Sequence, residues 1–143
     1  MSIVIRSLGK QQGESTVACV AHGAYEFTAL VHGSKSGLAS FVNRDCLAEM
    51  SFSRIASWKA IPDFSDEQSC IRTSSEGEGA IVVLGRVHNF TEVDDHSGIV
   101  DLYLQTGPEF LAISSQELGG DIPVVGTALE VTVYGLCFYP TGK

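Results

Sequence analysis

Apolar and polar residues alternate along much of this chain, and that alternation has the period of a half-buried β-strand. The pattern predicts strands at residues 16–21, 25–31 and 99–105, with every second residue apolar in the last two. Longer apolar runs at residues 80–93 and 127–139 predict two further strands. We therefore expect an all-β fold with mainly antiparallel pairing.

Glycine-rich polar segments separate these strands, because glycine tolerates the positive φ angles of tight turns. Residues 33–37 predict a turn, and the apolar run at 38–42 then predicts a hairpin with the strand before it. Residues 94–98 predict a second turn, which joins the strands at 80–93 and 99–105.

The remaining segments are less regular. Residues 46–61 fit both a helical stripe and a strand, and the neighbouring strands favour a strand as far as about Ile55. Residues 62–79 form a long polar loop with a short strand near 70–72, and residues 115–120 can hold one helical turn. No long amphipathic helix is evident, so we expect at most one short helix.

Gly85 and Gly135 interrupt the two longest apolar runs. A glycine inside a strand often marks a bulge or the sharp bend of a small barrel. With the hairpin between them and the turn at 124–126, these features of residues 81–139 resemble the oligonucleotide/oligosaccharide-binding barrel, the OB-fold. The resemblance implies a small OB-like Greek-key or meander barrel. Together with the earlier strands it predicts one domain over residues 1–143.

The net charge of −8 is unevenly distributed. Residues 1–86 carry eight Lys or Arg and nine Asp or Glu, whereas residues 87–142 carry eight acidic residues and no Lys or Arg. Because an anionic surface attracts cationic partners, we predict a non-enzymatic binding or adaptor protein that recognises the basic surface of a protein partner. An inhibitor or immunity protein of a basic nuclease or toxin would fit, as would a subunit of an assembly. The predicted contact residues are Glu92, Asp94, Asp95, His96, Asp101 and Tyr103.

The OB-fold resemblance implies an alternative function, the binding of single-stranded nucleic acid or a nucleotide. Lys35, Arg44 and Arg86 are the candidate phosphate contacts. Binding phosphates takes Lys and Arg, but acidic residues are interleaved with the basic ones in the first half of the chain. Nucleic acid therefore ranks below a protein partner.

A second alternative is a small hydrolase or metal-dependent enzyme built around Asp94, Asp95 and His96. Hard cations bind several oxygens on one loop, but this loop lacks the glycine position and closing glutamate of an EF-hand. Asp and Ser side chains also make ordinary turn hydrogen bonds. Since no nucleophile elbow or cysteine-protease signature is present, we predict no enzymatic activity, no metal and no cofactor.

Cysteine spacing and hydropathy bear on the cellular compartment in which the protein is expected. No two of the four cysteines have a C-x-x-C spacing, so we expect buried free thiols and no structural zinc. No window approaches the roughly 20 apolar residues of a membrane span, and the N-terminus lacks the pattern of a secretory signal. These features predict a cytoplasmic location without membrane contact. An exposed edge strand could also pair two copies, which makes a homodimer a further prediction.

Overall fold

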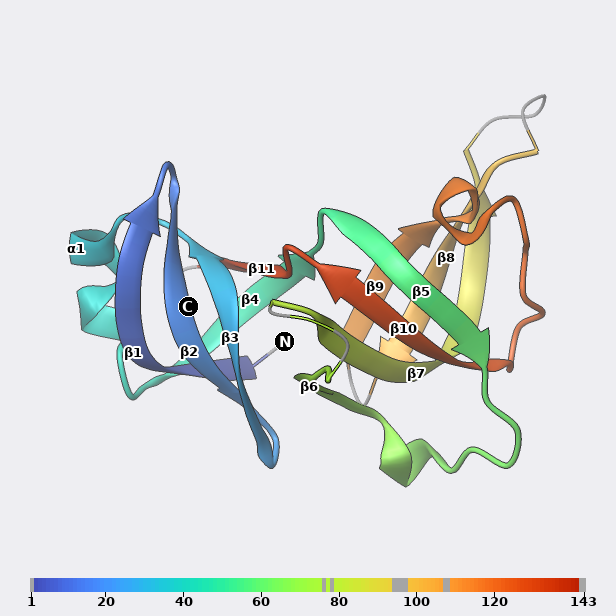
Figure 1. The fold of residues 1–143 in the computed structure, drawn as a ribbon, viewed down its shortest axis with the longest axis horizontal. Coiled ribbons are helices and arrows are strands. Elements are labelled where there is room, and N and C mark those ends of the chain that lie inside the picture. Colours follow the sequence, from blue (N-terminus) through green and yellow to red (C-terminus); the bar gives the residue numbers. More distant parts are fainter. Residues whose placement is uncertain (1, 76, 78, 94–97, 107–108, 142–143) are drawn as a thin grey trace.

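The computed structural model describes residues 2–75, 77, 79–93, 98–106 and 109–141. Nearly all regular structure in these ranges is β-strand, with one short α-helix and three short 3-10 helices (Figure 1). The all-β prediction with at most one short helix is confirmed. The elements in chain order are β1 (Ser2–Gln12), β2 (Ser15–His22), β3 (Tyr25–His32), α1 (Lys35–Leu38), η1 (Ala39–Phe41), β4 (Asp45–Ser51), β5 (Arg54–Ala60), η2 (Asp66–Gln68), β6 (Cys70–Thr73), β7 (Ile81–Glu92), β8 (Val100–Thr106), β9 (Glu109–Ser114), η3 (Ser115–Leu118), β10 (Ala128–Tyr134) and β11 (Cys137–Pro140).

Five of the strands close into a small barrel in the order β1-β2-β3-β11-β4 and back to β1. All neighbours are antiparallel except β3 and β11, which run parallel with Phe138 opposite Val31. The last strand of the chain thus fills the place between β3 and β4. The predicted small barrel is present, but its predicted location at residues 81–139 was wrong. Only β11 of that range belongs to the closed barrel, because alternation identifies a strand without identifying its neighbours.

The other strands form an open antiparallel sheet in the order β5-β10-β7-β8-β9. The long strand β7 has two partners on one of its sides. Its first residues pair with β6, and its later residues pair with β8. In Figure 1 the barrel occupies the left half of the molecule and the open sheet the right half. The strands β5 and β9 are the two edges of this sheet.

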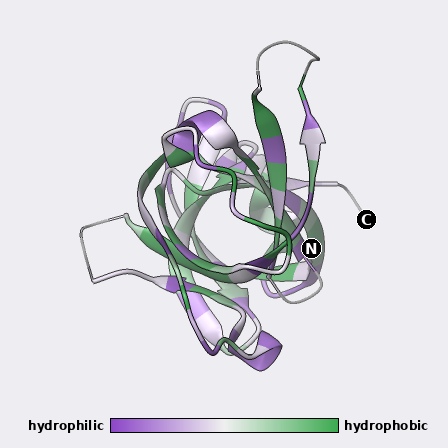
Figure 2. Ribbon diagram, turned by 90° about the vertical axis from the view of Figure 1, so that its right-hand side faces the viewer, coloured by the Kyte–Doolittle hydropathy of each residue, from purple (hydrophilic) through white to green (hydrophobic). Residues whose placement is uncertain are grey.

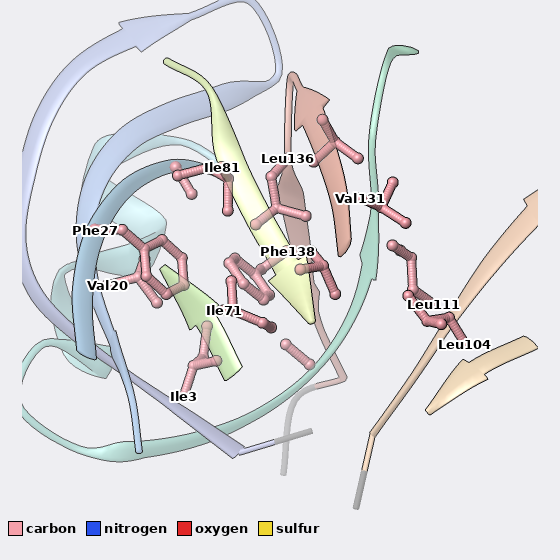
Figure 3. Close-up of a cluster of buried hydrophobic side chains, with 14 of the residues drawn as sticks. Ile3, Val20, Phe27, Ile71, Ile81, Leu104, Leu111, Val131, Leu136 and Phe138 are labelled. Carbon is pink, nitrogen blue, oxygen red and sulfur yellow. The ribbon is translucent and has the colours of Figure 1, made fainter. Parts of the chain in front are cut away.

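One continuous set of buried side chains runs from the barrel into the open sheet. Figure 3 shows Phe27 and Phe138 facing each other in the barrel and Leu104 and Leu111 at the far end of the set. Viewed along the long axis in Figure 2, the strands wrap around a common axis and alternate between hydrophobic and hydrophilic residues. The alternation predicted for β3 and β8 is confirmed, since Phe27, Leu102 and Leu104 are all buried.

The hairpin predicted between residues 25–31 and 38–42 is wrong. Residues 35–41 form α1 and η1 instead, and β3 pairs with β2 and β11. The Ser34 hydroxyl accepts a hydrogen bond from the Gly37 amide at 3.0 Å and caps the short helix. Leu38 is 3% exposed. The cap and the burial of Leu38 favour the helical turn over the strand that its apolar neighbours suggested.

The chain crosses between the two sheets at two adjacent points. Residues 46–61, which fitted either helix or strand, form β4 in the barrel and β5 in the open sheet. The predicted single strand at 127–139 is also two strands, β10 and β11, and Gly135 between them has φ +71°. The Ser53 amide donates to the Tyr134 carbonyl at 2.9 Å, so the two crossings lie against each other.

Gly85 does not mark the bulge that the sequence suggested there. The register shift in β7 falls two to four residues later, between Val87 and Asn89. Gly85 is instead a point of close approach, because a Cβ on it would overlap the carbonyl oxygen of Gln105 in β8.

All four cysteines carry free thiols, as predicted. Cys46, Cys70 and Cys137 are buried, whereas Cys19 is partly exposed. Burial raises the pKa of the Cys46 thiol, which keeps it protonated. Among the described helices, none has the length and apolar character needed to cross a membrane.

Candidate functional site

A groove separates the barrel strand β4 from the edge of the open sheet. Its cavity volume is about 390 Å³. Ala48, Glu49 and Met50 line the barrel side. The sheet side is lined by Tyr103 from β8 and by Glu109, Phe110 and Ala112 from β9. We call this the acidic–aromatic groove, because Glu49 and Glu109 supply its charge and Tyr103 and Phe110 supply its rings.

Tyr103 and Phe110 lie on the same face of the sheet. Tyr103 pairs with Ala112 and Gln105 pairs with Phe110, so the two rings come from diagonal positions on neighbouring strands. Phe110 is 46% exposed. Two aromatic rings side by side on an open surface provide contact area of the kind that dominates binding energy in protein interfaces.

A second hollow continues from the groove across the outer face of the sheet. It has a volume of about 480 Å³ and shares Tyr103 and Phe110 with the groove. His88, Asn89 and Thr91 of β7 complete its lining. The His88 ring meets the edge of Phe110 at a centroid distance of 5.2 Å. The register shift beside His88 places this side chain there, since a bulge re-aims the residue it adds.

Two carboxylates, those of Glu49 and Glu109, line the groove. Glu49 is exposed on β4, and among the described basic residues none forms an ion pair with it. Burial lowers the pKa of His22, at the end of β2, and the charge of Glu109 opposes that shift in part. His22 is therefore mainly neutral at pH 7.

The predicted acidic contact residues do not all come together. Tyr103 lies in the groove, and Asp101 lies two residues along β8 on the same face, opposite Thr91 and Ser114. Glu92 is exposed at the far end of β7. Asp94, Asp95 and His96 lie outside the described residues. Glu130, which contributes to the acidic excess, pairs with Lys59 at 3.4 Å and Arg72 at 3.8 Å.

The described residues also bear on the metal-enzyme alternative. Within the ranges that the structure describes, no three His, Cys, Asp or Glu side chains gather closely enough to hold a metal ion. Asp94, Asp95 and His96, the residues proposed for this alternative, lie outside these ranges.

The predicted basic residues lie in different halves of the molecule. Lys35 begins α1 and Arg44 follows η1, at the barrel end, whereas Arg86 belongs to β7 in the open sheet (Figure 1). They do not form one phosphate-binding patch.

Arg86 holds two loops against the sheet. Its guanidinium donates to the Gly126 carbonyl at 2.7 Å, to the Phe64 carbonyl at 2.9 Å and to an Asp66 carboxylate oxygen at 2.9 Å. The group also lies over the Phe64 ring, 5.3 Å from its centroid. The carboxylate contact contributes little, because Asp66 is largely exposed. The two carbonyl contacts fix residues 62–69 and the turn at 124–126.

We expect Arg86→Lys to lower the free energy of unfolding by about 1–2 kcal/mol, because an ammonium cannot reproduce the planar fork of donors. Residues 62–69 should also become more sensitive to proteases. Chemical denaturation and limited proteolysis measure both effects. Arg6→Lys is the matched control, since Arg6 makes only an exposed ion pair with Glu26, and its cost should stay below about 0.5 kcal/mol. Equal effects of the two substitutions would contradict the clamping role of Arg86.

Sequence reasoning found Tyr103 but missed most of the groove. Glu49 and Met50 belong to a segment whose secondary structure was ambiguous, and Glu109 and Phe110 begin a short strand that looked like an isolated apolar piece. The exposed alternation of β9, with Phe110 and Ala112 outside and Leu111 and Ile113 inside, is the one local signal that could have pointed to them.

Comparisons of this chain with protein-family models, with curated proteins and with solved structures found no match.

Proposed function

We propose that this protein is a non-enzymatic binding protein that recognises a basic segment of a protein partner at the acidic–aromatic groove. The observation that carries the proposal is the combination of Glu49 and Glu109 with the half-buried ring of Tyr103 and the exposed ring of Phe110 along one groove. A carboxylate attracts Lys or Arg, and an aromatic face adds cation–π attraction to the same charge. The groove therefore fits basic side chains better than any other common class of ligand.

The distribution of charge supports a cationic partner over a phosphate-bearing one. Residues 87–142, which supply the sheet side of the groove, contain no Lys or Arg. Lys35 and Arg44 lie at the barrel end, and the Arg86 guanidinium is already bound by protein acceptors. A phosphate in the groove would meet the carboxylates of Glu49 and Glu109, which repel it.

The chemistry of the groove supports binding without catalysis. Its lining consists of two carboxylates, two aromatic rings, two alanines and a methionine. This lining contains no Ser, Thr, Cys or Lys to serve as an activated nucleophile and no His to serve as its base. An inhibitor or immunity protein of a basic nuclease or toxin would use such a groove, and so would a subunit that docks on a basic neighbour.

The proposal is tested with heptalysine as a cationic probe, by calorimetry at low and at physiological salt. We expect binding that weakens with salt, and we expect Glu49→Gln to weaken it by about threefold to tenfold through loss of charge attraction. Glu67→Gln on η2 removes the same charge outside the groove and serves as the matched control. Equal weakening by both variants would mean that the probe senses only net charge, and the groove would lose its assigned role.

The architecture of the barrel favours a second candidate function. The strands β1, β2 and β3 follow one another, and β4 returns to lie beside β1, which is the spatial order of a Greek key. A five-stranded Greek-key barrel is the architecture of the OB-fold, and we propose that assignment for the barrel. OB-folds bind oligonucleotides through the face of their second and third strands, here β2 and β3.

Filter binding of single-stranded DNA and RNA at low salt separates the two functions. If the barrel binds nucleic acid, Lys35→Glu and Arg44→Glu should abolish retention, because each reverses a charge beside the barrel. Arg86 is unsuitable for this test since its substitution would release the loops it holds. Retention that depends on Lys35 and Arg44 would place nucleic-acid binding ahead of protein binding.

A further inference from the structure

The two edges of the open sheet differ in how they are protected. The edge strand β5 carries Arg54 and Lys59, and its pairing with β10 has a register shift beside Ala56. Charged side chains and bulges are the usual means by which proteins stop an edge strand from pairing with another chain. The edge at β5 is therefore protected.

The edge strand β9 has no bulge and no basic side chain along its length, and its one charged residue is Glu109 at its start. It pairs with β8 over six consecutive positions without a register shift. Glu109–Ser114 contains no Lys, Arg or Pro. Leu111 and Ile113 are fully buried and anchor the strand, whereas Phe110 and Ala112 are exposed. A regular, anchored and mostly apolar edge strand is a template for an additional strand.

The acidic–aromatic groove runs along this regular edge. Glu109, Phe110 and Ala112 of β9 form one side of it, and Glu49 of β4 faces them from the other side. A segment that lies in the groove therefore lies next to the backbone of β9. In the part of the chain that the structure describes, β9 pairs through its backbone with β8 alone, while β4 of the barrel approaches it across the groove.

We propose that the basic partner segment binds as an extended strand added to the edge of β9. The inference rests on the proposed function and adds to it the conformation of the partner. Every second residue of an edge strand directs its amide and carbonyl away from its neighbour, and these groups bind the added backbone. Alternate side chains of the added strand fall on the face of Tyr103 and Phe110, where basic groups meet the rings and Glu49.

The probe for this inference is an acetylated and amidated seven-residue peptide of alternating lysine and valine. Amide hydrogen exchange of the protein is followed by NMR with and without the peptide. We expect the peptide to slow exchange at every second residue of 109–114, since the intervening amides are already bonded to β8. Two N-methylated peptides provide a further test, one with methyl groups on the odd-numbered amides and one with methyl groups on the even-numbered amides. Only one of these two sets of amides can donate hydrogen bonds to β9, so the two peptides should differ at least tenfold in affinity.

A pair of variants tests the same edge from the side of the protein. Ala112→Lys places a charge on exposed β9 and should weaken peptide binding at least tenfold. Ala56→Lys makes the same change on the exposed edge of β5 and should leave binding unchanged. Both alanines are exposed, so neither variant disturbs the core.

The outcomes separate the two proposals. Peptide binding that is sensitive to Glu49→Gln but leaves the amides of β9 unprotected would overturn strand addition and leave the proposed function standing. No binding of any peptide would overturn both. Protection of β9 that appears without peptide as the protein concentration rises would show that a second copy occupies the edge, and would overturn the assignment of the edge to a basic partner.

Discussion

Gly85→Val is expected to lower the free energy of unfolding by about 3 kcal/mol or more, since a strained core insertion typically costs 1–3 kcal/mol even when side chains can move aside. At this position the obstacle is backbone. A Cβ on Gly85 would overlap the carbonyl oxygen of Gln105, and the side chain of Leu104 lies 3.3 Å away. A carbonyl in a paired strand cannot rotate away without breaking the pairing of β7 with β8. Chemical denaturation measures the loss.

Gly9→Ala is the matched control for this prediction. Gly9 also lies inside a strand, and a Cβ on it would come within 3.2 Å of the Val17 carbonyl oxygen, a contact that a shift of a few tenths of an ångström relieves. Its cost should stay within about 1 kcal/mol. If the Gly85 variant were as stable as the Gly9 variant or more so, the close approach of β7 and β8 at Gly85 would be contradicted.

The strands themselves were largely predictable, because their signal is local. Alternation in β3 and β8 gave the correct buried faces, and the short strand at β6 and the helical turn at η3 were found in otherwise polar surroundings. Gly85 and Gly135 were also recognised as special positions, although the sequence could not tell a close approach from a bulge. The failure at residues 38–42 has a local cause too, since a capping serine outweighed a short apolar run.

The pairing of the strands was not predictable from these patterns. The barrel closes only when β11, more than 80 residues after β4 in the chain, enters between β3 and β4. No periodicity carries information about a contact of that kind. The acidic–aromatic groove was missed for the same reason, because Glu49 and Phe110 meet only after the barrel and the open sheet have formed. Tyr103 was predicted as a contact residue because its strand shows a clear alternation with a polar face and follows an acidic turn, and both of these signals are local.

The groove therefore depends on barrel closure. Glu49 and Met50 belong to β4, and β4 is held by its pairing with β11, where Tyr139 lies opposite Glu49 and Phe138 opposite Met50. The first residues of β4 pair with β1, but this pairing ends at Leu47. The barrel side of the groove is thus positioned mainly by the last strand of the chain.

Phe138→Ala is expected to lower the free energy of unfolding by about 3–5 kcal/mol, the usual cost of truncating a fully buried phenylalanine. Phe138 is 0% exposed, and its ring centroid lies 6.1 Å from that of Phe27 on the neighbouring strand β3. The cavity would lie between β3 and β4, where β11 joins them, so it cannot collapse without opening the barrel. Denaturation with urea measures the effect, and the variant should also bind the cationic probe more weakly than the native chain under folding conditions.

Tyr139→Ala distinguishes the loss of the buried ring from a general weakening of β11. Tyr139 is the next residue, points to the other face and is 41% exposed, with its ring stacked on His32 at 5.2 Å. Its removal should cost clearly less than that of Phe138, about 1–2 kcal/mol, since part of its ring stays in water and its loss leaves no enclosed cavity. Similar costs for the two variants would show that β11 contributes through its backbone alone. A large cost for Phe138→Ala together with native probe affinity would show that the groove keeps its shape without the buried ring, and barrel closure would then stabilise the fold without positioning Glu49.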